Sequence, residues 1–244
     1  MNIHVAKNAK DLGVRAAAQI ASLLRETIKE KGTARLLLST GASQFQTISS
    51  LIKEKVDWSK VQMFHLDEYV GLSEKHKASF RKYLKDRFTS KVNLKAAWFV
   101  DGEGDVNANI ACLTKEFVKA PIDVGVIGIG VNGHIAFNDP PADFKTKKSY
   151  MIVTLDKKCR QQQVGEGWFK TVADVPPKAI TMTPYAIMKS RHIISCVPHG
   201  VKADAILNSL TRKVSPTVPA SLLKTHPDWN LYIDAESAAK VFPV

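Results

Sequence analysis

The sequence has few cysteines and no long apolar run. Its 244 residues include three cysteines, Cys112, Cys159 and Cys196, which are widely scattered. An odd, scattered set is typical of free thiols in a reducing compartment. The longest apolar stretches, such as residues 124–131, are far shorter than the roughly 18 residues of a membrane-spanning helix. The opening residues MNIHVAK lack the apolar core of a signal peptide. We therefore expect a cytoplasmic protein with no membrane partner.

Glycine and proline are also sparse and follow no period. With 13 Gly, 11 Pro and 45% hydrophobic residues, the chain is neither collagen-like nor disordered. No internal repeat or low-complexity linker divides it, and its length is within the range of one large α/β domain. We predict a single domain over residues 1–244.

Sequence motifs for several kinds of chemistry are missing. The chain has no Cys/His spacing of a metal site, no Gly-x-Ser-x-Gly elbow and no Cys-x-x-Cys pair. We therefore expect no metal and no cofactor. The formal net charge is +12, but the basic residues are spread among acidic ones, and the densest basic run, residues 145–148, is short. This favours a solvated basic surface or an anionic small substrate, with no nucleic acid as partner.

Hydrophobic periodicity predicts alternating strands and helices. Short apolar runs typical of buried strands lie at residues 35–39, 61–66, 124–129, 151–155, 192–197 and 231–233. Helical spacing is found at residues 11–30, 43–55, 79–88, 106–119 and 201–210. The alternation predicts an α/β fold, a single-domain open, mostly parallel sheet with helices on both faces in a Rossmann-like, three-layer sandwich. Ligands bind beyond the carboxyl ends of strands in such sheets, so the segments after the strands are candidates for the site.

The first such segment contains Ser39, Thr40, Gly41, Ala42 and Ser43. Small residues allow a tight strand-to-helix turn whose amides and hydroxyls point at an anion. It matches neither the dinucleotide glycine pattern nor the nucleotide phosphate loop. An ordinary turn with Ser43 as helix N-cap explains it equally well.

The second segment places Asp67 and Glu68 after an apolar run. Adjacent side chains on a strand point to opposite sides, so one carboxylate faces a cleft while the other anchors locally. Partial burial raises a carboxyl pKa toward the range useful for a general base. An acidic pair that only ties a loop is the alternative.

The third segment, residues 126–140, has three glycines within six residues and then His134, with Asn132 and Asp139 near it. Glycines at this density indicate close approach of the backbone to another group. Hydrogen-bonding neighbours are suited to holding one imidazole tautomer, which favours a functional over a structural histidine. Farther along, Lys202 opens a helical pattern after a strand, a place suited to a phosphate contact, although most such lysines are only solvated.

Together these segments resemble the glucosamine-6-phosphate deaminase (isomerase) family, in the same superfamily as the 6-phosphogluconolactonases. The resemblance covers nearly the whole chain. It is carried by LDEYVGL at residues 66–72, GIGVNGHIAFN at 128–138, PAS at 219–221 and HP at 226–227. Lactonases usually continue Gly-His with Thr-Ala-Ser-Leu-Phe, so the deaminase branch is the closer match.

The resemblance implies an enzyme that opens the ring of glucosamine 6-phosphate, isomerises aldose to ketose, and releases ammonia to give fructose 6-phosphate. Asp67 would move a proton between C2 and C1, and His134 would assist ring opening. The catalytic set implied is Asp67, His134, Asn132 and Asp139. The substrate-binding set implied is Ser39, Thr40, Gly41, Ala42, Ser43, Glu68, Gly133 and Lys202.

The chain departs from the family at three places. Asn132 and Asp139 stand where Asp and Glu are usual, and Asp139 is one methylene shorter. Arg160 matches an upstream arginine of the family, but residues 160–169 lack the arginine that contacts the substrate phosphate. Phosphate binding would then depend on Lys202 or on another basic residue that the sequence does not identify. The basic residues of the allosteric site of some members find no match in residues 145–150, so no such regulation is expected.

Three alternatives stay open at this point. The sugar phosphate could differ, for example galactosamine 6-phosphate. The chain could be a hydrolase of the 6-phosphogluconolactonase type. It could also be a non-catalytic sugar-phosphate sensor, for which the missing arginine and the shorter Asp139 are the arguments. The resemblance also leaves a homo-oligomer open.

Overall fold

The centre of the molecule is a parallel sheet in the order β1-β10-β9-β6-β2-β3-β5, seen in a computed structural model that describes residues 1–165 and 167–242. Its seven strands are β1 (Asn2–Ala6), β2 (Ala34–Leu38), β3 (Val61–His65), β5 (Ala96–Trp98), β6 (Val124–Val126), β9 (His192–Val197) and β10 (Trp229–Asp234). All neighbouring pairs are parallel. A second, antiparallel sheet has the order β4-β8-β7 and consists of β4 (Asp67–Tyr69), β7 (Tyr150–Thr154) and β8 (Lys178–Met182).

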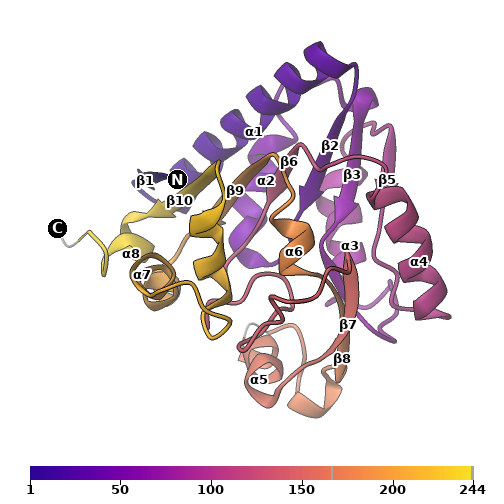
Figure 1. Ribbon diagram of the computed structural model, residues 1–244, viewed down its shortest axis with the longest axis vertical. Coiled ribbons are helices and arrows are strands. Elements are labelled where there is room, and N and C mark those ends of the chain that lie inside the picture. Colours follow the sequence, from indigo (N-terminus) through magenta and orange to yellow (C-terminus); the bar gives the residue numbers. More distant parts are fainter. Residues whose placement is uncertain (166, 243–244) are drawn as a thin grey trace.

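Helices cover both faces of the parallel sheet (Figure 1). One face carries α1 (Ala9–Lys31), α2 (Phe45–Leu51), α3 (Phe80–Leu84) and the π-helical turn η3 (Lys85–Thr89). The other carries α4 (Val106–Phe117), α6 (Pro184–Ile187), η6 (Pro219–Thr225), α7 (Ala203–Thr211) and α8 (Ala235–Ala238). The remaining elements are α5 (Lys157–Gly165) and the short turns η1 (Ala42–Gln44), η2 (Trp58–Lys60), η4 (Val172–Asp174) and η5 (Gly200–Lys202).

Strand β2 illustrates why two helical layers form. All five of its residues are buried, and successive side chains on a strand point to opposite faces. Leu36 and Leu38 pack in the cluster that contains α1, whereas Leu37 packs in the cluster on the opposite face. A strand that is apolar on both faces is stable only when both are covered, as in parallel α/β sheets.

Local signals determine the ends of α1. The side chain of Asn8 accepts a hydrogen bond from the amide of Asp11 (3.0 Å) and caps the helix. Gly32 ends it with φ 77°, a left-handed conformation that glycine adopts without strain. The helix predicted at residues 11–30 is thus confirmed.

The α/β class, the mostly parallel sheet and the helices on both faces are confirmed. Several details differ from the sequence expectation. The strand expected at residues 124–129 ends at Val126, and the helix expected at 43–55 begins as η1 and ends at Leu51. β7 does not belong to the parallel sheet. Its alternating burial, with Ile152 exposed, is typical of an antiparallel sheet with one face in solvent.

Figure 1 shows α5, β7 and β8 as a small lobe beyond the end of the parallel sheet. β4 links the two parts, because it follows β3 after a single residue and pairs with β8. The lobe therefore stands over one edge of the region where the parallel strands end. None of the helices in residues 1–165 and 167–242 combines the length and apolar character needed to span a bilayer.

Candidate active site

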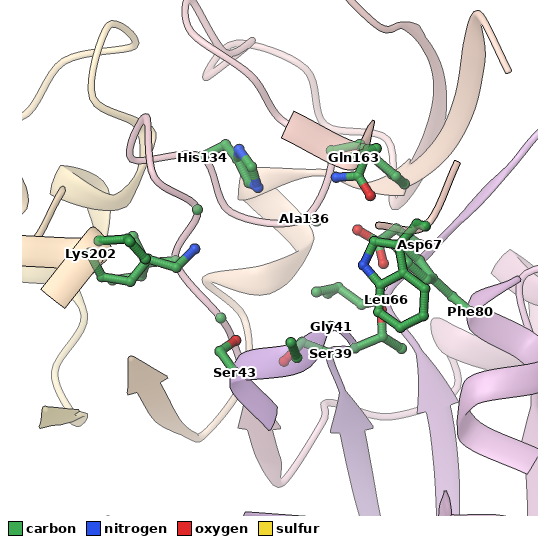
Figure 2. Close-up of a pocket in the computed structure, with 18 of the residues that line it drawn as sticks. Ser39, Gly41, Ser43, Leu66, Asp67, Phe80, His134, Ala136, Gln163 and Lys202 are labelled. Carbon is green, nitrogen blue, oxygen red and sulfur yellow. The ribbon is translucent and has the colours of Figure 1, made fainter. Parts of the chain in front are cut away.

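An open cavity of about 220 Å³ lies at the carboxyl ends of the central strands. Its walls come from segments that follow β2, β3, β6 and β9, and from α5 in the lobe. Figure 2 shows Asp67 and Gln163 at one end of this pocket and Lys202 at the other, with His134, Ser39 and Ser43 between them. Segments far apart in the sequence thus meet where parallel α/β sheets place their ligands.

The loop of residues 39–43 forms the floor of the pocket, and all five of its residues line it. Ser39 is anchored by its amide, which donates to the carbonyl of Val126 (3.0 Å). Its buried hydroxyl has no hydrogen-bond partner among the described residues. Gly41 turns the chain with φ 97°, where a side chain would be strained. The loop therefore presents small polar groups to the cavity.

Ser43 does not cap a helix, contrary to the simpler interpretation of this turn. η1 begins at Ala42 with Gly41 in the cap position and no side-chain cap bond. The Ser43 hydroxyl instead accepts from the buried side-chain amide of Gln44 (3.1 Å).

Asp67 faces the cavity from the start of β4. Its side chain is buried, and none of the hydrogen bonds among the described residues reaches its carboxylate. Burial first, and the nearby charge of Glu68 second, raise the pKa of Asp67 well above the usual value of a carboxyl. A carboxylate in this environment is a stronger base than one in water, which suits proton abstraction.

Glu68 points away from the cavity and does not line it, so the prediction that it contacts the substrate is wrong. Its carboxylate accepts from the amides of Tyr69 (2.9 Å), Phe80 (3.2 Å) and Arg81 (2.8 Å) and from the Ser79 hydroxyl (2.8 Å). The physical reason is the alternation along β4, which sends the neighbours of Asp67 to the other side. Glu68 ties β4 to the start of α3.

His134 is held in one orientation above the pocket. Its Nδ1 lies 2.6 Å from Oδ1 of Asn132 and 3.2 Å from Oδ1 of Asp139. The Asn132 side-chain amide donates to the same oxygen of Asp139 (3.0 Å). Because the neighbours of Nδ1 are both acceptors, Nδ1 carries a hydrogen and Nε2 is the position available to a ligand.

Asp139 remains ionised over a wide pH range. Burial acts to raise its pKa, but the hydrogen bond and charge of His134, with the bonds from Asn132 and Cys159, outweigh this effect and lower the pKa to about 2. Asn132, Gly133 and Asp139 do not themselves line the cavity. They act on it through His134, so Gly133 is a turn residue, with φ 82°, rather than a group in the pocket wall.

Gly130 explains why the segment after β6 is rich in glycine. A Cβ atom at this position would lie 2.1 Å from Cε1 and 2.2 Å from Nε2 of His134. The imidazole therefore packs directly on the backbone of Gly130, and only glycine leaves room for it.

Lys202 and His199 form the end of the pocket that follows β9. Lys202 is the last residue of η5, directly before α7. His199 has φ 79°, which is unusual for a residue with a side chain. Its amide donates to both carboxylate oxygens of Asp234 (3.1 Å each).

Sequence reasoning missed several residues of the pocket wall: Phe80, Gln163, Trp168 and His199. His199 could have been found, because it lies two residues after the end of the strand predicted at 192–197. Gln163 and Trp168 lie in the segment of the missing arginine, where no pattern indicates which side chains face the cavity. Arg160 is on α5 outside the pocket wall, and Glu166 of the same segment lies outside the described residues.

One group in the described residues has ligand atoms close enough for a metal ion. Atoms of His199, Asp234 and Glu236 lie within 4.8 Å of one another. The two carboxylates already accept backbone amides, because Asp234 binds those of His199 and Ser237, and Glu236 binds that of Gly200 (3.3 Å). Loop anchoring accounts for these acids.

Comparison with known proteins gives consistent matches over the whole chain. A family model described as glucosamine-6-phosphate isomerases/6-phosphogluconolactonase matches residues 7–231. Glucosamine-6-phosphate deaminase of Thermoanaerobacter pseudethanolicus is 32% identical over 249 residues, covering 99% of this chain and 95% of the relative. The protein of the same name from Clostridium botulinum strain Langeland is 33% identical over 252 residues, with 99% of each covered.

Solved structures agree. A monomeric glucosamine-6-phosphate deaminase superimposes with a TM-score of 0.88 at 31% identity, covering 98% of this chain and 100% of the other. A 6-phosphogluconolactonase from Trypanosoma brucei has a TM-score of 0.79 at 14% identity, covering 99% of this chain and 98% of that one. The second match is a likeness of fold.

Proposed function

Because the chain belongs to the family of glucosamine-6-phosphate isomerases and 6-phosphogluconolactonases, we propose that it converts glucosamine 6-phosphate and water to fructose 6-phosphate and ammonia. The relatives named for this reaction are about one third identical and match over nearly their full length. The observation that carries the proposal is the convergence of Asp67 and His134 on one cavity that has Lys202 at its far end (Figure 2).

The phosphate of the substrate would bind between the 39–43 loop and Lys202. The loop offers the hydroxyls of Ser39, Thr40 and Ser43, and the Ser39 hydroxyl is buried without a partner among the described residues. Lys202 supplies a positive charge across the pocket. Fixing the phosphate far from the reacting carbons orients them and reduces the entropy lost in the reaction.

His134 would act first, on the ring. Opening the sugar transfers the proton of the C1 hydroxyl away and returns a proton to the ring oxygen. Nε2 faces the pocket while Nδ1–H is held by Asn132 and Asp139, so a proton taken up at Nε2 gives an imidazolium that the Asp139 carboxylate stabilises.

Asp67 would then take the proton from C2 of the open-chain aldehyde. The electron pair of the C–H bond forms the C1–C2 double bond of an enolamine, and the carbonyl oxygen gains a proton. Return of a proton to C1 gives the 2-imine of fructose 6-phosphate. Water adds to that imine, and ammonia leaves as the C2 carbonyl forms, which balances the reaction.

We also propose a domain organisation and a cellular location for the enzyme. We take residues 1–244 to work as one domain, since the pocket draws on segments from Ser39 to Lys202. We place it in the cytoplasm, where sugar phosphates are made and thiols stay reduced, as suits the free cysteines Cys112, Cys159 and Cys196.

A substrate panel tests the proposal. Purified protein is incubated with glucosamine 6-phosphate, galactosamine 6-phosphate or 6-phosphogluconolactone, and the ketose phosphate, ammonia and acid products are assayed separately. Release of fructose 6-phosphate and ammonia in equal amounts from the first substrate is expected. Turnover of galactosamine 6-phosphate alone would mean that this sugar phosphate is the substrate. Turnover of the lactone alone would mean that the protein is a hydrolase of the 6-phosphogluconolactonase type. Binding of glucosamine 6-phosphate without turnover of any substrate would make it a sensor.

A further inference from the structure

Gln163 is a buried amide in the wall of the pocket that the proposed reaction leaves unused. It lies on α5, is 6% exposed, and lines the cavity beside Asp67 (Figure 2). Its Oε1 accepts a hydrogen bond from the hydroxyl of Tyr69 (2.7 Å). A glutamine side chain offers one acceptor and one two-proton donor, so this bond leaves the amide nitrogen for another partner.

Tyr69 is a rigid support for this amide. Its ring is fully buried and packs against the rings of Phe80, Phe137 and Phe169, with centroids 5.2, 5.1 and 5.5 Å away. Side chains two apart on a strand share a face, so Tyr69 and Asp67 project to the same side of β4. The Tyr69 hydroxyl therefore orients the Gln163 amide next to the carboxylate of Asp67.

The amide nitrogen of Gln163 and the carboxylate of Asp67 have complementary needs. Among the described residues, the only hydrogen bond of the Gln163 side chain is the one from Tyr69, and no hydrogen bond reaches the Asp67 carboxylate. Both side chains are more than nine-tenths buried. Both residues line the same cavity, and a donor and an acceptor that do not bond to each other there fit a ligand that binds both.

We propose that Gln163 is a specificity-determining residue that donates a hydrogen bond from Nε2 to a substrate oxygen on C1 or C3, beside the C2 proton that Asp67 removes. The assignment rests on the proposed function. Tyr69 is its positioning residue. An uncharged donor suits this place, because a lysine or arginine so near Asp67 would favour its ionised form and weaken it as a base. The amide selects substrates that carry an oxygen on the contacted carbon. The phosphate contacts at the other end of the pocket do not distinguish substrates by that oxygen.

The experiment measures binding of 2-amino-2-deoxyglucitol 6-phosphate, an open-chain analogue that cannot react, by titration calorimetry. Its 1-deoxy and 3-deoxy forms are the comparison ligands. Wild-type protein is expected to bind the parent analogue about ten-fold more tightly than the form lacking the contacted oxygen. Gln163→Met, which has a similar length and no amide, should bind the parent about ten-fold more weakly than wild type and lose the discrimination.

Matched variants separate recognition from structure. Gln161→Met changes an exposed glutamine on the same helix and should leave the affinity and the discrimination unchanged. Gln163→Leu also lacks the amide and carries no titratable group, so it should show the same loss as Gln163→Met and replaces that variant if it fails to fold. Tyr69→Phe frees the amide to rotate and should show a smaller loss, without adding to that of Gln163→Met in the double variant.

The outcomes are distinguishable. If folded Gln163→Met and Gln163→Leu bind the analogue as wild type does, or keep its preference among the deoxy forms, Gln163 is not a specificity residue although the proposed function stands. If wild-type protein binds none of the three analogues, the proposed function itself is wrong, and this assignment with it.

Discussion

At the scale of single residues, the consecutive carboxylates of Asp67 and Glu68 face opposite sides of β4. Asp67 is buried at the pocket with no hydrogen-bond partner among the described residues, whereas Glu68 accepts from four neighbours on the other side of β4. The sequence predicts that one faces a cleft and one anchors, because side chains alternate along a strand. It does not say which, since that depends on where β8 and α3 pack.

Replacing Asp67 by Asn should reduce kcat by at least roughly 10²-fold, the usual scale for the loss of a general base. The amide has the same shape but cannot accept the C2 proton. Affinity for 2-amino-2-deoxyglucitol 6-phosphate, measured by calorimetry, should stay within a few-fold of wild type. Near-normal kcat in the steady-state assay would contradict the role of Asp67 even if the substrate is right.

Replacing His199 by Gly should raise the free energy of unfolding by about 1 kcal/mol. His199 has φ 79° and ψ 140°, a region in which glycine is unstrained, and the amide bonds to Asp234 need no side chain. His199→Ala is the matched control, because it also removes the imidazole but keeps Cβ and the strain. Urea unfolding of the three proteins measures the difference, and equal stability of the Gly and Ala variants would contradict it.

At the scale of elements, the turn after β6 combines local signals with one tertiary contact. The amide of Gly130 donates to the carbonyl of His134 (2.9 Å) and that of Gly133 to the carbonyl of Gly130 (3.0 Å). The density of glycine predicts close approach of another group, but only the folded turn shows that the group is the imidazole of His134 itself.

Replacing Gly130 by Ala should reduce kcat by roughly 10²-fold, as for a displaced acid–base group, while the protein stays folded. The new methyl would occupy the place of the His134 ring, which must swing away from the pocket. Gly165→Ala is the matched control, because a Cβ there meets no atom within 4 Å. Thermal unfolding checks the fold, and full activity of Gly130→Ala would show that the orientation of His134 does not matter.

The strands and helices themselves were predicted with uneven success. Long periodic segments such as α1 were recognised because burial of one stripe repeats along the helix. The strands β1, β4, β5 and β8 were not, since they are short or partly exposed, and their residues pair only with distant parts of the chain. Of the lobe, local pattern analysis predicts only β7 as a strand; it does not indicate α5, and Gln163 was missed for that reason.

At the scale of the whole molecule, the buried interior contains a histidine that should make stability depend on pH. His65 is fully buried. Its Nδ1 accepts from the amide of Val100 (3.3 Å) and its Nε2 has no partner among the described residues. Burial first, and the charge of Arg81 second, lower its pKa to about 3.

The free energy of unfolding should therefore fall as the pH falls from about 6 to 4. In this window the unfolded chain binds a proton at His65, whose ordinary pKa is about 6.5, while the folded chain does not, so stability is lost at up to about 1.4 kcal/mol per pH unit. His65→Gln keeps an acceptor for Val100 and cannot titrate, so its curve should lack this slope. The free energy of unfolding is measured for both proteins by urea denaturation at several pH values. The same pH dependence in the two proteins would contradict the prediction.

The positive net charge should raise the rate at which the protein binds its substrate. The chain carries a formal charge of +12, and a sugar phosphate is an anion, so long-range attraction raises the association rate. Raising the ionic strength from about 0.05 to 0.5 M should lower kcat/KM several-fold and leave kcat nearly unchanged, because salt screens distant charges more than contacts inside the pocket. Chloride and acetate salts are compared to exclude competition by one anion, and a kcat/KM independent of salt would contradict steering.

The sequence by itself determined the alternation of buried strands and helices, the turn of small residues at 39–43, and the choice of Asp67, Glu68 and His134 as candidates for the chemistry. These follow from local periodicity and from the few residue types that can serve such turns and such chemistry. Only the tertiary structure decided which carboxylate faces the cavity, and that Gln163 and His199 join its wall. Those placements depend on β4 pairing with β8 and on α5 closing over the strand ends. Contacts between residues about a hundred positions apart produce no periodic pattern in the sequence.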